Sequence, residues 1–208
     1  MSLARLNSRA PNGLDAPSVA VEVHLSGGLP SFTIVGLPEA AVRESRERVR
    51  SAVINSGFDF PPRRITVNLA PADLPKQGGR FDLPIALGIL AASGQLRSPQ
   101  SDFSGEYLGE LGLGGELRPI PGVLPAILAA HELGRPVMLP MANCAEASLV
   151  QDVRLLAVES LAQAAAHLSG DMPVSALTAC VPLEKLGQGN AEEDLKDICG
   201  QPFGVRAL

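Results

Sequence analysis

Aromatic side chains are scarce in this sequence. It has no Trp, one Tyr (Tyr107) and six Phe among 208 residues. A surface that reads single-stranded nucleic acid by stacking bases on aromatic rings is therefore not expected. With 46% hydrophobic and 19% charged residues the chain still has a globular composition, so its core must be built from Val, Ile, Leu and Ala.

Long hydrophobic runs are also missing. The longest nearly continuous run, residues 83–92, has ten residues and contains a Pro, which is well short of the ~20 residues needed to cross a bilayer. Residues 1–12 contain two Arg, but no apolar stretch follows them as it does in a signal peptide. We therefore expect a cytoplasmic chain without membrane contact.

The residues that bind metals or form disulfides are few and scattered. The three cysteines lie 36 and 19 residues apart and form no C-x-x-C pair, which suits neither a disulfide framework nor a zinc site. They are Cys144, Cys180 and Cys199. The three histidines are equally dispersed, so no metal site is predicted.

Lysine is rare as well, and this excludes a nucleotide-binding loop. A Walker A motif requires a Lys followed by Ser or Thr, because the ammonium reaches the phosphates and the hydroxyl holds Mg²⁺. Lys76, Lys185 and Lys196 are followed by Gln, Leu and Asp. No P-loop lies within these residues, and no G-x-S-x-G nucleophile elbow is present.

The charge is distributed unevenly along the chain. The overall net charge of −5 combines a net of +3 over residues 1–100 with a net of −8 over residues 101–208. Any anion-binding surface is thus expected in the first half. Arg43, Arg46 and Arg50 share one side of a predicted helix there, as a stripe that contacts phosphates would.

The same helix has a second interpretation. Glu39 lies four residues before Arg43, and Glu44 lies four residues before Arg48. Such pairs stabilise an exposed helix and cancel much of its field. This pattern favours a solvated or subunit-contact face over a nucleic-acid contact.

A second candidate anion site lies in the loop 70–80. Gly78 and Gly79 precede Arg80 there, and Asp73 and Lys76 belong to the same loop. The alternative interpretation is a tight loop whose glycines adopt positive φ, which the residues alone favour.

Strand and helix patterns alternate along the chain, which predicts an α/β or α+β fold with a mixed sheet. Residues 19–25 and 31–35 are predicted to form a hairpin, and the helix at residues 83–93, with Asp82 as its N-cap, is apolar almost all round. The other predicted strands are residues 64–69, 107–111, 116–119, 136–140 and 155–158, and the other predicted helices are residues 39–55, 123–132, 144–149 and 161–168.

The pattern changes at the end of the chain. Residues 171–190 contain two Pro and two Gly and show no clear periodicity, which predicts a linker over residues 169–191. The acidic segment that starts at residue 192 predicts the beginning of a further structural unit.

Several long strings resemble one family. They are residues 21–25 (VEVHL), 32–39 (FTIVGLPE), 42–50 (VRESRERVR), 65–76 (ITVNLAPADLPK) and 78–84 (GGRFDLP). Together they resemble the N-terminal domain of the ComM/YifB proteins, the bacterial magnesium chelatase-like AAA+ ATPases, over residues 1–168.

The resemblance implies a fold and a domain organisation. The fold would be of the ribosomal protein S5 domain 2-like type, similar to the proteolytic domain of Lon and to the C-terminal domain of RadA. Residues 1–168 would form the Lon-like domain, residues 169–191 a linker and residues 192–208 the truncated start of the AAA+ module.

The likeness to Lon raises the question of proteolysis. Lon proteases use a Ser–Lys dyad, and the matching segments place Arg80 where the serine would be and Leu124 where the lysine would be. Neither side chain can act as a nucleophile or a general base at neutral pH. The resemblance therefore implies a domain without catalytic residues.

In that family the intact protein is a hexameric, ATP-driven DNA helicase that promotes branch migration during natural transformation. ATP and Mg²⁺ would belong to the intact protein and not to these residues, and the partners would be DNA and further copies of the chain. The residues expected to contact DNA phosphates or a neighbouring subunit are Arg43, Arg46, Arg50, Lys76 and Arg80. The alternatives are a subunit of a magnesium chelatase-type ATPase and a residual Lon-like hydrolase.

Overall fold

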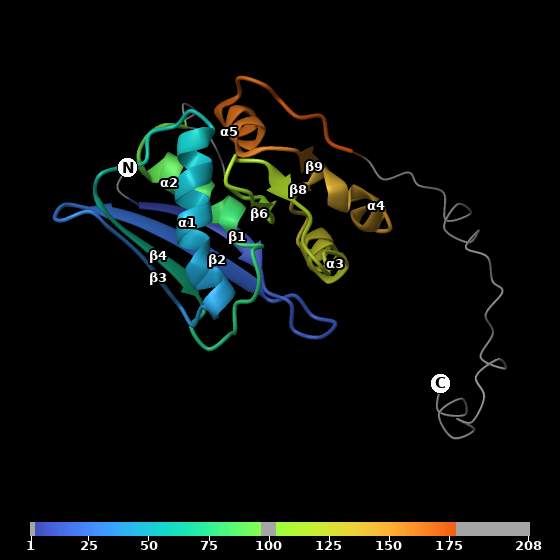
Figure 1. The fold of residues 1–208 in the computed structure, drawn as a ribbon. Helices are drawn as coiled ribbons and strands as arrows, with labels where there is room; N and C mark the ends of the chain where they lie inside the picture. The colour runs from blue at the N-terminus through green and yellow to red at the C-terminus, as the bar shows by residue number, and fades with distance from the viewer. Residues whose placement is uncertain (1–2, 97–102, 178–208) are drawn as a thin grey trace, which may run out of the picture.

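The computed structural model describes residues 3–96 and 103–177 (Figure 1). Seven strands form one mixed sheet in the order β3-β4-β2-β1-β5-β8-β9, and β6 pairs with β7 in a separate hairpin. The strands are β1 (Leu3–Arg9), β2 (Ser18–Ser26), β3 (Ser31–Val35), β4 (Arg64–Ala70), β5 (Glu106–Tyr107), β6 (Glu110–Leu111), β7 (Leu117–Arg118), β8 (Val137–Pro140) and β9 (Leu155–Val158). The helices are α1 (Ala40–Asn55), α2 (Asp82–Ala92), α3 (Leu124–Glu132), α4 (Cys144–Ala147) and α5 (Leu161–Ser169), with a 3-10 turn at Met141–Asn143. The mixed α/β class is thus confirmed.

The half of the sheet made by β3, β4, β2 and β1 is covered on one face only. Alternate residues of β2 and β4, among them Val21, Val23 and Val67, are fully buried beneath α1 and α2. The residues between them are half-buried or, as at His24 and Arg64, exposed. This alternation is the pattern expected of an antiparallel sheet with one face on the core and one in water.

Helix α2 lies inside the molecule. Every residue from Asp82 to Ala92 except Ala91 is buried, as its uniformly apolar sequence predicts. It contacts β1 and β2 on one side and α1 and α5 on the others. A residue with no side chain is required where α2 approaches the sheet, because a Cβ on Gly88 would press on Val23 and Leu6.

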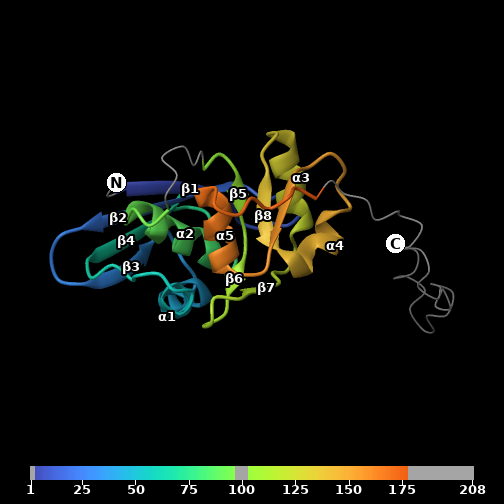
Figure 2. The ribbon, with the colours of Figure 1, turned by 90° about the horizontal axis from the view of Figure 1, so that it is seen from above.

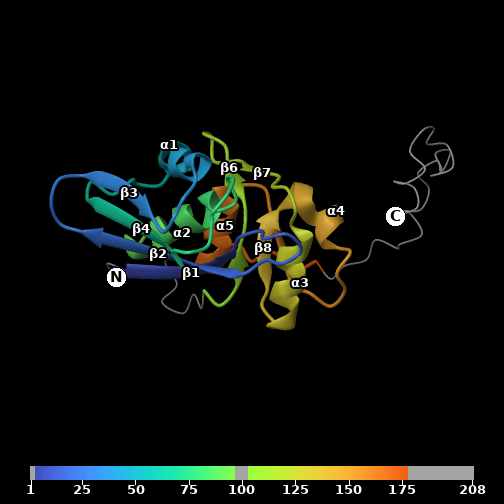
Figure 3. The ribbon, with the colours of Figure 1, turned by 90° about the horizontal axis from the view of Figure 1, so that it is seen from below.

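The other half of the sheet, made by the parallel strands β5, β8 and β9, is covered on both faces. Val137 and Leu139 pack into a core beneath α3 and α4, whereas Met138 between them packs into the main core that also holds α5. Figures 2 and 3 show α1 and α3 on opposite sides of the molecule. Parallel strands with both faces buried are the usual arrangement.

The predicted hairpin of residues 19–25 and 31–35 is wrong. Both strands form, but β4 lies between them, antiparallel to β2 and parallel to β3. A parallel pair needs a crossover connection, and α1 provides it between β3 and β4. β4 is a central strand and its residues Ile65 and Leu69 are fully buried, whereas β3 is the edge of the sheet.

Three further differences concern single elements. Strand β1 was not predicted, because its buried positions include Ala4, Ser8 and Arg9, which weaken the alternation of large apolar and polar residues. The predicted strand 107–111 is divided into β5 and β6, which belong to different sheets. The N-cap of α2 is Phe81, and Asp82 lies in the first turn and takes other partners.

The boundaries at the end of the chain remain predictions. The described part of the predicted linker 169–191 is attached to the domain, because Leu177 exchanges backbone hydrogen bonds with Leu155 of β9 at 2.9 and 3.4 Å. The rest of that linker and the predicted AAA+ start at 192–208 lie outside the described residues.

The turn after β3 depends on one glycine. Gly36 has a φ of 98°, and a Cβ there would clash with the carbonyl oxygen of Leu69 and lie 2.8 Å from its carbonyl carbon. We expect Gly36→Ala to lower the free energy of unfolding by more than about 2 kcal/mol, because it adds a backbone clash to an unfavourable φ. Gly27→Ala is the matched control, since nothing lies within 4 Å of its Cβ position. Denaturant unfolding of both variants checks this, and equal losses would contradict it.

Candidate functional site

The two segments that a Lon-type dyad would require lie side by side. The guanidinium Nη2 of Arg80 donates a hydrogen bond to the carbonyl oxygen of Pro121 at 2.8 Å. Backbone hydrogen bonds of 3.0 Å join Gly109 to Arg80 and Leu83 to Gly109, so the segment between β5 and β6 fixes the start of α2. The structure therefore brings together the two segments that the resemblance to Lon matches to the dyad, and Arg80 lies at their contact.

Arg80 is an internal residue. Arg80 is only 4% exposed, and its Nη1 has no hydrogen-bond partner among the described residues. Burial lowers the pKa of Arg80 from its ordinary value, and the charge of Glu146 opposes that shift. An arginine keeps its charge even so, because a guanidinium is not deprotonated in proteins. The position holds a buried cation and offers no nucleophile.

The second dyad position is equally inert. Leu124 begins α3 and packs against the smaller core. The backbone N–H groups of Val123 and Leu124 donate to Oε1 of Glu146 at 3.1 and 3.2 Å. Glu146 thus caps α3, and no general base replaces the lysine.

Lys76 is also buried. It has no exposed surface, and its Nζ donates to the carbonyl oxygen of Pro71. Burial lowers the pKa of Lys76, while the charge of Asp73 raises it. The backbone of the same residue accepts a 3.2 Å hydrogen bond from Glu39, so this loop fixes the start of α1.

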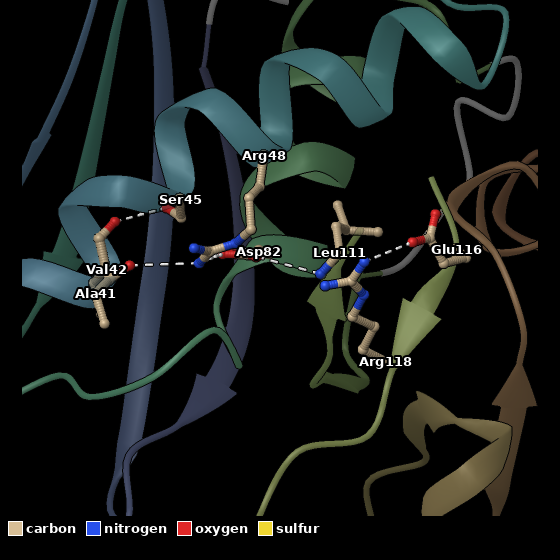
Figure 4. Close-up of polar contacts among 8 residues, drawn as sticks. All are labelled: Ala41, Val42, Ser45, Arg48, Asp82, Leu111, Glu116 and Arg118. Atoms are coloured by element: carbon tan, nitrogen blue, oxygen red, sulfur yellow. Dashed lines mark hydrogen bonds and ion pairs between the residues drawn. The ribbon is translucent and has the colours of Figure 1, made fainter. Parts of the chain in front are cut away.

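An ion pair that the sequence did not reveal joins α1 to α2 (Figure 4). Arg48 donates to the two carboxylate oxygens of Asp82 at 2.7 and 3.2 Å, and the N–H of Leu111 donates to the same carboxylate at 3.2 Å. The sequence assigned Arg48 to Glu44, four residues earlier, and that pair is not formed. The buried position of Asp82 was the available signal, because an acid in an all-apolar helix needs a partner.

Arg43, Arg46 and Arg50 all lie on the exposed side of α1. The predicted Glu39–Arg43 pair does not form either, and none of the four ion pairs among the described residues includes these three arginines. The five candidate residues therefore fall into two groups: three exposed arginines on α1, and Lys76 and Arg80 in the interior.

No metal site or membrane helix is found among the described residues. Within residues 3–96 and 103–177, no three His, Cys, Asp or Glu side chains gather as metal ligands would. No helix in the same ranges is long and apolar enough to span a membrane.

The chain is similar to one described family. A family model described as "Subunit ChlI of Mg-chelatase" matches residues 21–143. Competence protein ComM of Haemophilus influenzae is 50% identical over 210 aligned residues, which cover 100% of this chain and 41% of that protein. The uncharacterized protein YifB of Escherichia coli is 45% identical over 208 residues, which cover 100% of this chain and 40% of that protein.

The chain also has a more distant similarity to a Lon protease. Lon protease of Chloroflexus aurantiacus is 31% identical over 135 residues, covering 60% of this chain and 16% of that protein. The chain spans about two fifths of the length of the ComM and YifB proteins that it matches.

The raised pKa of Asp82 predicts an unusual pH dependence. Burial raises the pKa of Asp82 to about 6, although hydrogen bonds and charge from Arg48 lower it. The folded chain therefore holds this proton more tightly than the unfolded chain, and its free energy of unfolding falls as pH rises from about 4 to about 6. Asp82→Asn lacks this contribution. The difference between wild type and variant should move in favour of the variant by on the order of 2 to 3 kcal/mol over that interval.

Denaturant unfolding of both proteins at several pH values between 4 and 7 measures this. Parallel curves would show that the pair with Arg48 balances the burial of the carboxylate. A shift in favour of wild type as pH rises would show that the pair outweighs the burial.

Proposed function

Because the chain belongs to the ChlI family, together with ComM and YifB, we propose that it is a non-catalytic module of a ComM-type hexameric AAA+ ATPase that acts in DNA branch migration during natural transformation. Its tasks in that assembly are contact with DNA and association with further copies. ATP and Mg²⁺ would be bound elsewhere in the intact protein.

The observation that carries the proposal is the buried Arg80. The chain is 31% identical to a Lon protease over 135 residues, and the two segments that the resemblance matches to its dyad are in contact. A guanidinium and an aliphatic side chain occupy the two reactive positions. A domain that retains this architecture without its chemistry is suited to binding, which is what the proposal assigns to it.

The competence role is supported by the identity to ComM over the entire chain. The relative's name refers to competence. The exposed arginines of α1 are the feature of this chain that suits a partner rich in phosphate.

The test uses the gene product that contains this chain. We expect that protein to hydrolyse ATP, to form hexamers and to move the branch point of a three-stranded DNA substrate. Removing residues 1–177 should reduce the stimulation of ATP hydrolysis by DNA and leave basal hydrolysis measurable, because the module would contact DNA without taking part in the reaction. ATP hydrolysis that DNA stimulates equally with and without this segment would contradict the proposal.

A chelatase-type subunit is the second candidate, and the description of the matching family favours it. The described residues contain no cluster of metal-binding side chains that would support it directly. ATP-dependent insertion of Mg²⁺ into a porphyrin by the intact protein, with no movement of DNA branch points, would establish this candidate in place of the first.

A residual hydrolase is the third candidate, and a fluorogenic casein assay on the chain tests it. We expect no turnover above buffer, because Arg80 and Leu124 supply neither nucleophile nor base. Turnover that is abolished by replacing a single serine would contradict the non-catalytic assignment.

A further inference from the structure

We infer that Arg43, Arg46 and Arg50 form a phosphate-binding row on α1 that holds the DNA backbone without reading its sequence. The inference rests on the proposed function for the identity of the partner. It assigns the contact to these three residues and gives Lys76 and Arg80, which are buried, a role in fixing the loops around them.

The spacing of the row suits a nucleic-acid strand. At a rise of 1.5 Å per residue, the Cα atoms of Arg43 and Arg50 are separated by roughly 10 Å along the helix axis. One strand of B-DNA carries a phosphate about every 3.4 Å along its axis. Three arginines at this spacing can therefore contact on the order of three phosphates.

Two of the three guanidinium groups are held in place before any ligand binds. Arg46 donates to the carbonyl oxygens of Arg43 at 3.1 Å and of Phe32 at 3.4 Å. The guanidinium of Arg50 lies 5.0 Å from the ring centre of Phe60, which itself packs on Phe32 with 5.8 Å between centres. Ordering long side chains in advance lowers the entropy lost on binding.

The partners that hold Arg46 and Arg50 are uncharged. A carbonyl oxygen and an aromatic ring orient a guanidinium but carry no net charge. Glu44 and Glu47 on the same helix are exposed and form no ion pair with the row, and Arg48 is used by Asp82. Within the described ranges, the row is a set of exposed cations without carboxylate partners, which is the electrostatic condition for binding an anion.

The row consists of arginine alone, and this favours phosphate. A guanidinium is planar and donates two parallel hydrogen bonds to a phosphate, whereas an ammonium acts as a point charge. The chain has only three lysines, and none of them lies on α1. Contact with another copy of the chain is the competing use of this face, and the experiment below separates the two.

The experiment measures binding of the 208-residue chain to a fluorescein-labelled 30-base-pair duplex by anisotropy over a range of salt concentrations. The test variant is Arg43→Gln/Arg46→Gln/Arg50→Gln. The matched control is Arg5→Gln/Arg64→Gln/Arg154→Gln, which removes three exposed arginines from other elements and gives the same net charge. Circular dichroism and thermal unfolding confirm that both variants fold.

We expect the test variant to bind more weakly and the slope of log K against log salt to fall in magnitude by about 2 to 3, since each phosphate contact contributes about 0.9. The control should retain most of the wild-type slope. Equal losses in the two variants would overturn the inference, because only net charge would then matter.

Two other outcomes separate this inference from the proposed function. If the wild-type chain binds DNA and the test variant binds equally well, the assignment of the contact to the row is wrong, whereas the proposed DNA contact is retained. The same conclusion follows if the test variant changes only the mass of an assembly measured by light scattering, because the face then contacts another copy. If the wild-type chain binds no DNA at low salt, the DNA contact in the proposed function fails together with the row.

Discussion

The burial of α2 is the constraint on which the rest of the structure depends. An apolar helix surrounded by β1, β2, α1 and α5 has no solvent at its first turn, so every polar group there needs a partner from the protein. Arg48 and the N–H of Leu111 supply partners to Asp82, and the backbone of Gly109 supplies them to Arg80 and Leu83. These contacts determine where α1 and β6 must lie.

The segment just before α2 directs the search for function to the surface. The resemblance to Lon matches Arg80 there to the nucleophile, and its buried guanidinium is hydrogen-bonded to Pro121. Because Arg80 and Lys76 are used internally, the free positive charge of this half of the chain is left to exposed arginines. The use of these two residues in the interior supports the proposed role as a binding module, in which exposed arginines make the contact.

The sequence predicted which segments form helices and strands better than it predicted which strands lie side by side. Periodicity identified α1, α2 and β4 nearly to their observed ends, because these patterns are local. It could not place β4 between β2 and β3, since strand order depends on the crossover through α1 and on which strand is most buried. The candidate residues were found by type and spacing. Their division into exposed Arg43, Arg46 and Arg50 and buried Lys76 and Arg80 required the tertiary structure.

DNA is proposed to contact the exposed side of α1 and not the loop 71–80. The most direct measurement is an NMR titration of the ¹⁵N-labelled chain with a short oligonucleotide, following the side-chain Nε–H signals of the arginines. The account predicts shifts for Arg43, Arg46 and Arg50 and an unchanged signal for the buried Arg80. Shifts confined to Arg80 and the loop 71–80, with the signals of α1 unchanged, would contradict it.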